Sequence, residues 1–164
     1  MRRFVFFLII LTGITAFAVA CNREDAVPKT VTDVYFVDSR LRRLLPYECE
    51  VIDAMPQDMA NAVISAIIKG RDSDTGILRI VPDEEDLLSV KVKDTVAYVD
   101  INSKIKRELK HNRETEKLFI FQIVNSLTSL KGIRFVKFTM DGAIHEDFLG
   151  FYDMRETFKF TYPE

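Results

Sequence analysis

The first 21 residues constrain this 164-residue chain most, because they have the composition of a segment that is removed before folding. Arg2 and Arg3 precede an almost wholly apolar stretch over residues 4–20, which ends on small residues directly before Cys21. This order is typical of a secretory signal peptide, and the cysteine at its end is typical of a lipoprotein signal. We therefore predict a signal peptide over residues 1–20, lipidation at Cys21, and an exported, membrane-anchored protein that faces the periplasm or the outside of the cell.

Two other interpretations of this segment stay open. Ala18 and Ala20 satisfy the small-residue rule for ordinary cleavage, which would release a secreted protein with Cys21 as a thiol. The apolar run also approaches the roughly 17 residues of a short transmembrane helix, although two threonines and a glycine interrupt it. In every case the folded part works outside the cytoplasm, away from the ATP and NAD pools that many enzymes need.

The rest of the chain has the length of one domain, which we divide into a tether over residues 21–32 and a single domain over residues 33–164. The whole chain has 23 basic and 25 acidic residues, so loss of Arg2 and Arg3 leaves 21 basic residues against 25 acidic ones. This slightly acidic balance predicts solubility and argues against nucleic acid as a partner.

The two cysteines and two histidines show no ligand spacing, so we predict no metal site and no cofactor. If Cys21 carries lipid, we expect Cys49 to be a small hydrophobic residue buried in a strand. If Cys21 is not lipidated, a Cys21–Cys49 disulfide becomes an option in an oxidising compartment.

The hydropathy pattern predicts an α+β fold, with a mixed, mostly antiparallel sheet and two helices packed on one face. Apolar residues three or four apart predict the helices, and alternating residues predict the strands. A basic connector over residues 40–46 separates the first two strands. The expected strands are residues 31–38, 49–55, 77–81, 89–93, 96–101, 135–140, 143–149 and 158–162, and the expected helices are residues 57–69, 104–109 and 114–130.

No constellation of residues indicates catalysis, so we predict no catalytic residues and no enzyme. The acidic residues 83–86 are expected in a solvated turn, and residues 72–76 lack the distal glutamate of a calcium loop. Ser126 and Ser129 have no glycine elbow beside them. A hydrolase would have to depend on His145, which follows a predicted hairpin turn and is expected at the surface.

Two polar features of the helices are expected to serve the structure. Asn125 and Thr128 lie near the apolar side of the second long helix, where they can form hydrogen bonds to strand ends or loops. The basic residues 104–110 are expected to form a solvated helix face, with contact to lipid head groups or an acidic wall polymer as the alternative.

Short segments follow one another here in an order that is found in a known family. They are Asp33-Val34-Tyr35-Phe36, Ile67-Ile68-Lys69-Gly70, Ile80-Val81-Pro82, residues 96–102 and residues 123–142, the last of which ends in Asp141-Gly142. In this order they resemble the GerMN domain of sporulation and spore-germination lipoproteins and of other bacterial envelope proteins. The resemblance covers roughly residues 31–152.

The resemblance implies a fold similar to the small α/β ring-building modules of spore-channel proteins. It implies no catalytic residues, and the matched Asp100, Gly132, Asp141 and Gly142 are expected at strand ends and turns.

We therefore expect a non-catalytic, lipid-anchored cell-envelope protein whose GerMN-like domain is a protein-interaction or assembly module. Its partners would be the membrane, through the lipid, and an envelope protein, the cell wall or a second copy of itself. One alternative is a small extracytoplasmic ligand-binding lipoprotein, which requires a Phe-lined pocket of about 300 Å³ or more between helices and sheet. The other alternative is the hydrolase that uses His145.

Overall fold

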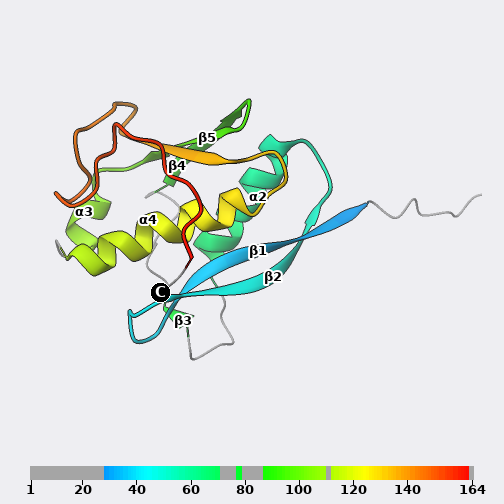
Figure 1. The fold of residues 1–164 in the computed structure, drawn as a ribbon, viewed down its shortest axis with the longest axis horizontal. Helices are drawn as coiled ribbons and strands as arrows, with labels where there is room; N and C mark the ends of the chain where they lie inside the picture. The colour runs from blue at the N-terminus through cyan, green and yellow to red at the C-terminus, as the bar shows by residue number, and fades with distance from the viewer. Residues whose placement is uncertain (1–27, 71–76, 79–86, 110–111, 163–164) are drawn as a thin grey trace, which may run out of the picture.

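A computed structural model describes residues 28–70, 77–78, 87–109 and 112–162 of the chain, and Figure 1 shows their arrangement. The predicted acidic turn at residues 83–86, the loop at residues 72–76 and Cys21 lie outside the described residues. The described elements, in chain order, are β1 (Lys29–Asp38), β2 (Leu44–Ile52), α2 (Pro56–Lys69), β3 (Ile77–Leu78), β4 (Leu87–Lys93), β5 (Val96–Ile101), α3 (Ile105–Glu108), α4 (Arg113–Thr128) and β6 (Phe135–Met140).

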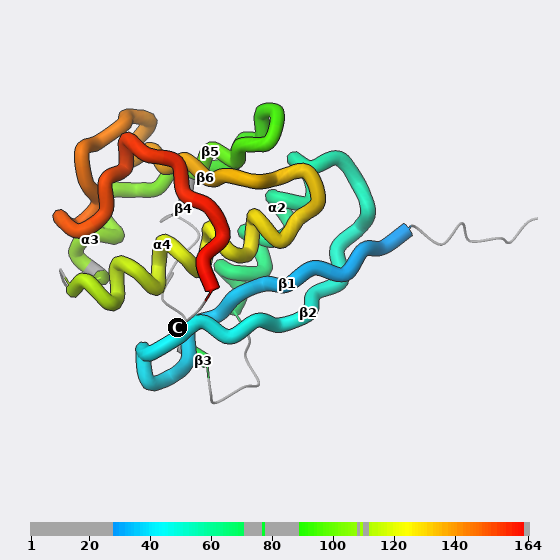
Figure 2. Tube along the Cα trace, in the orientation of Figure 1, coloured from blue at the N-terminus to red at the C-terminus, as the bar shows by residue number. Residues whose placement is uncertain are grey.

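The strands of the described residues form two three-stranded sheets, with the orders β2-β1-β3 and β4-β5-β6. All neighbouring strands are antiparallel except β5 and β6, which are parallel. The two long helices lie between the sheets: α4 contacts β1 and β6, and α2 contacts β1 and β4 (Figures 1 and 2). The predicted α+β class with mostly antiparallel pairing is confirmed. The described strands form two sheets where one was predicted, and the helices cover a face of each sheet.

The core fills the space between the two sheets. On α4, Ile120, Ile123 and Leu127 are buried, and their spacing of three and four residues places them on one side of the helix. The helices and the strands β1, β4, β5 and β6 lie within a few residues of the predicted ranges. β1 begins at Lys29, so the last four residues of the predicted tether belong to this strand.

The second strand begins earlier than predicted, at Leu44 instead of Cys49, and it includes Pro46. The backbone N–H of Tyr35 donates to Ser126 Oγ at 2.8 Å, on the side of β1 away from β2. Alternate residues of a strand direct their backbone groups to opposite sides, and Tyr35 pairs with Pro46. Pro46 therefore faces the open edge of the sheet, where a residue without an N–H loses no hydrogen bond of the ladder.

The two strands predicted after β6 are wrong. The turn at Asp141-Gly142 forms, with positive φ angles of 50° and 77°, but only the single bridge Met140↔Ala143 follows it. Residues 143–162, called here the C-terminal segment, form no strand and pair with β6 once more, at Val136↔Phe158. Its buried side chains, among them Phe148, fall at irregular intervals, so the segment packs through individual side chains and not through a ladder.

None of the described helices combines the length and the apolar composition that crossing a membrane would require.

Candidate functional site

The C-terminal segment is attached to α4 through a fully buried amide. The side chain of Asn125 has no exposed surface, and its Nδ2 donates to the carbonyl oxygen of Thr161 at 2.8 Å. In return the N–H of Thr161 donates to Asn125 Oδ1 at 3.1 Å. The Asn125 amide thus forms the two hydrogen bonds that the backbone of Thr161 would otherwise form with a neighbouring strand. The expectation that Asn125 bonds to a loop is confirmed. Thr128 instead donates back to Val124 O of its own helix, at 2.7 Å.

A second buried side chain, Glu116, holds the middle of the C-terminal segment. Its Oε1 accepts hydrogen bonds from the N–H groups of Leu149 and Tyr152, at 3.3 and 3.2 Å. Burial raises the pKa of Glu116 above its ordinary value, and the backbone hydrogen bonds oppose this rise. Its Oε2 is buried without a hydrogen-bond partner among the described residues. This carboxyl group therefore holds the loop in place by hydrogen bonds, although its burial destabilises the ionised carboxylate.

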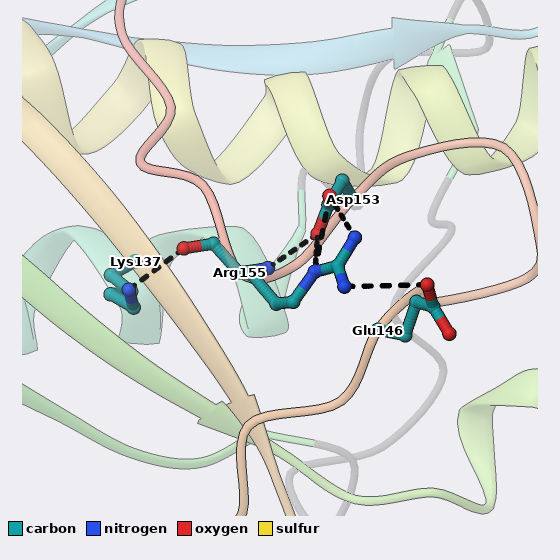
Figure 3. Close-up of polar contacts among 4 residues, drawn as sticks. All are labelled: Lys137, Glu146, Asp153 and Arg155. Carbon is teal, nitrogen blue, oxygen red and sulfur yellow. Dashed lines mark hydrogen bonds and ion pairs between the residues drawn. The ribbon is translucent and has the colours of Figure 1, made fainter.

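An ion-pair network on the exposed side of the C-terminal segment joins residues Glu146, Asp153 and Arg155, as Figure 3 shows. The guanidinium of Arg155 donates to Asp153 from Nε at 2.9 Å and from Nη2 at 2.7 Å, and it lies 3.3 Å from Glu146. The bond from Arg155 lowers the pKa of Asp153 to about 2. Lys137 of β6 donates to the carbonyl oxygen of Arg155 at 2.9 Å, which links the network to the sheet.

The acidic residues of the family resemblance organise the turn after β6. Asp100 Oδ1 accepts from Thr139 Oγ1 at 2.6 Å and from Gly142 N at 2.9 Å. Asp141 accepts from the N–H of Ser103 at 3.2 Å, and hydrogen bonds from Ser103 lower the pKa of Asp141. Gly132 adopts a φ of 96° at the turn before β6, which a residue with a side chain rarely adopts. The structural role expected for these residues is confirmed.

A cleft of about 500 Å³ lies where α4 ends, between the start of β1 and the first turn of α2. Thr32 lines it, and Thr32 Oγ1 is buried without a hydrogen-bond partner among the described residues. The volume of the cleft meets the prediction of about 300 Å³ or more, but the cleft has no phenylalanine in its wall. Its lining residues are Thr30, Val31, Thr32, Asp53, Ala54, Pro56, Met59, Ser129, Leu130, Lys131 and Gly132.

The remaining predicted residues do not assemble into a reaction centre. His145 is exposed after the turn, and the electrostatic neighbour identified for it is Asp141 of the same turn. No group of three potential metal ligands occurs in the part of the chain that the structure describes. Cys49 is half-buried in β2, opposite Thr32. The lipidation of Cys21 and the alternative disulfide stay predictions.

Sequence reasoning missed Glu116 and the role of Ser126. A signal for Glu116 was present, because it lies four residues before Ile120 and continues the apolar stripe of α4. A charged residue on a buried stripe needs a polar partner, and the partners are the loop amides described above. Ser126 was considered only as a nucleophile, whereas its hydroxyl connects α4 to the backbone of β1.

Comparison with known proteins supports the fold. No curated protein matches this chain by sequence. A Clostridium perfringens protein assigned as a lipoprotein superposes with a TM-score of 0.55 at 16% identity, over 85% of this chain and 92% of that protein. The first GerMN domain of the Bacillus subtilis sporulation protein GerM superposes with a TM-score of 0.53 at 16% identity, over 73% of this chain and 88% of that domain.

The tandem GerMN domains of the same protein superpose with a TM-score of 0.53 at 18% identity, over 88% of this chain. This chain spans only 50% of the tandem structure. The family model described as "Sporulation and spore germination", named Germane, matches residues 33–146. That range includes both long helices and every described strand except the first residues of β1, and it exceeds half of the chain. The chain belongs to the Germane family, with the fold of a GerMN domain.

Proposed function

We propose that this protein is exported, anchored in the membrane by lipid at Cys21, and serves as a non-catalytic interaction module of the cell envelope. Three findings support the proposal. The N-terminal segment has the order of a lipoprotein signal. The Germane family is described by sporulation and spore germination, and that description names no reaction. The protein assigned as a lipoprotein shares the fold over most of both chains.

The observation on which the interaction role depends is an exposed apolar surface at the start of β1. Val31, Ile52 and Met55 are 61%, 56% and 69% exposed. The pairing of Val31 with Glu50 places Val31 diagonally beside Ile52 on the same face of the sheet. Adjacent exposed apolar side chains are a feature of interaction sites. This surface, called here the tether-end surface, adjoins the cleft through Val31 and lies close to the point where the predicted tether meets the domain.

The anchoring part is tested by metabolic labelling with a fatty-acid analogue in cells that express the full chain. We expect labelling that Cys21→Ala abolishes, and globomycin should cause the precursor to accumulate. Label that persists in the Cys21→Ala variant would refute lipidation at this residue.

The interaction part is tested by photocrosslinking in living cells. A photoreactive residue at Val31 should give a discrete cross-linked species. A matched probe at Leu41, which is 40% exposed in the turn at the other end of the β1–β2 hairpin, should not. Equal cross-linking from the two positions, or none from Val31, would contradict a specific contact at the tether-end surface.

The cleft favours one second candidate, a small-ligand-binding lipoprotein. Its volume of about 500 Å³ lies within the usual range of small-molecule sites, and it has a buried hydroxyl in its wall. Native mass spectrometry of the full chain, purified in neutral detergent from its own host, would show a stoichiometric small molecule. A spectrum of the ligand-free mass alone would count against this candidate.

A further inference from the structure

The outward face of the β4-β5-β6 sheet has a composition unlike the rest of the molecule. Along β5 and β6, alternate residues are buried against the helices, and the residues between them face solvent. The solvent-facing residues of this sheet include three lysines and two aromatic side chains. This group, called here the basic face, consists of Lys91, Lys93, Tyr98, Phe135 and Lys137.

The strand register arranges these side chains in rows across the sheet. Tyr98 of β5 pairs with Lys91 on one side and with Lys137 on the other, so Tyr98 lies between two lysines. The ammonium group of Lys137 also donates to the carbonyl oxygen of Arg155 at 2.9 Å. Neighbouring strands are about 4.8 Å apart, which separates the two lysine backbones by about 10 Å. The next row contains Lys93, Val96 and Phe135, and it lies two residues, or about 7 Å, further along the strands.

The two sheets differ in the charges of their outward faces. Among the described residues, the acidic groups near the basic face are Asp94, in the turn between β4 and β5, and Asp100, whose Oδ1 already accepts hydrogen bonds from Thr139 and Gly142. Asp153 and Glu146 also lie near Lys137, and both are paired with Arg155. The outward face of β1 and β2 instead contains Asp33, Glu48 and Glu50, together with Lys29, which pairs with Glu50 at 2.8 Å. A chain with a formal net charge of −2 therefore presents a local cationic surface on one sheet. Such a surface attracts anions irrespective of the net charge.

We propose that the basic face binds an anionic envelope polymer in which phosphodiester groups link polyol or sugar units. Successive phosphates of such a polymer would meet Lys91 and Lys93, whose backbone positions lie about 7 Å apart on β4. Tyr98 and Phe135 are 39% and 37% exposed, so each ring lies partly against the sheet. A partly covered ring suits stacking on a polyol or sugar unit, and it does not project far enough to enter lipid tails. The polymer is thus favoured over a membrane surface as the source of phosphate.

The proposal deepens the proposed function, because it names the class of partner that an exported module would meet. It is tested separately from lipidation, by direct binding of the purified full chain in neutral detergent. The probe is fluorescently labelled poly(glycerol phosphate), and anisotropy reports binding. If the polymer does not bind but fatty-acid labelling at Cys21 is intact, the polymer is rejected and the lipid anchor stands. If the polymer binds but the labelling is absent, only the lipid anchor is rejected.

Matched variants locate the binding surface. The double variant Lys91→Glu with Lys93→Glu should weaken binding at least tenfold, which corresponds to about 1.4 kcal/mol. Arg40→Glu with Arg107→Glu changes the net charge equally at exposed positions outside the basic face, in the β1–β2 turn and on α3, and should alter the affinity less than twofold. Tyr98→Thr keeps a residue suited to a strand, and should weaken binding severalfold if the ring stacks on the polymer.

Four results would overturn the proposal. Binding that falls equally in both double variants would indicate attraction by overall charge alone. Binding lost only in the Arg40 and Arg107 variant would place the polymer elsewhere. Displacement of the polymer by mixed micelles of phosphatidylglycerol, at equal phosphate concentration, would show that the face recognises lipid head groups. Neutral dextran should not bind at all, and its binding would contradict the electrostatic argument.

Discussion

Replacing Asn125 by alanine should release the end of the C-terminal segment without unfolding the domain. The amide forms two hydrogen bonds with the backbone of Thr161, at 2.8 and 3.1 Å, and its side chain is fully buried. Thr161 itself is exposed, so water can replace the lost partners at its backbone. Each bond then contributes a net of about 1 kcal/mol, and the two together about 2 kcal/mol.

A cost of about 2 kcal/mol corresponds to a roughly 30-fold larger population of the state in which the segment is detached. The amide of Phe158 reports that population, because it donates to Val136 O at 2.8 Å and does not contact Asn125 directly. In hydrogen-exchange mass spectrometry we expect the peptide that contains Phe158 to exchange roughly 30-fold faster in the variant, while peptides of β1 keep their rates.

Thr128→Ala is the matched control, because Thr128 lies on the same helix and bonds only to its own helix backbone. If Thr128→Ala accelerates exchange around Phe158 as much as Asn125→Ala does, the amide does not hold the segment. If Asn125→Ala accelerates exchange uniformly across the domain, the contact stabilises the whole fold and the reasoning about local release is refuted.

Three further changes test the packing and the charges. Because burial raises the pKa of Glu116, its favourable contribution is present in full below its ordinary pKa and is lost as the pH rises through the folded-state pKa. In urea titrations between pH 4 and 8, the stability of Glu116→Gln relative to the unchanged protein should therefore increase with pH, and a constant difference would contradict this. Phe119→Ala, which removes a fully buried ring stacked 5.3 Å from Phe148, should cost about 3–5 kcal/mol of unfolding free energy, and a loss below about 1 kcal/mol would show that the cavity collapses. Arg155→Ala should return the pKa of Asp153 from about 2 towards its ordinary value in a carboxyl NMR titration, unless Arg155 is not its main partner.

The sequence predicted the parts of the fold in which one local pattern dominates. α2 and α4 have apolar stripes that bury against the sheets, and β5 and β6 alternate between buried and exposed residues. The first part of β2 could not be predicted, because whether Pro46 is compatible with a strand depends on which side of that strand has a neighbour. That neighbour is specified by long-range pairing and not by adjacent residues.

The C-terminal segment was mispredicted for a related reason. The alternation around Phe158 and Phe160 resembles a strand, but these rings pack against Phe121, Phe138 and Tyr35 from different elements. Asn125 then supplies hydrogen bonds that a neighbouring strand would otherwise have supplied. A single side chain that supplies these hydrogen bonds produces no periodic pattern in the sequence. Only the position of Asn125 near the apolar side of α4 therefore suggested a structural role.

The position of β1 has a mechanical consequence. β1 is the central strand of its sheet, and its first four residues are the last four of the predicted tether. A pull through the tether runs along β1 and across the hydrogen bonds that join it to β2, from the Lys29↔Ile52 pair to the Val37↔Leu44 pair. The bonds of this ladder are then loaded together in shear and not opened one after another. A domain connected in this way should withstand force on its anchor better than one whose tether peels an outer strand.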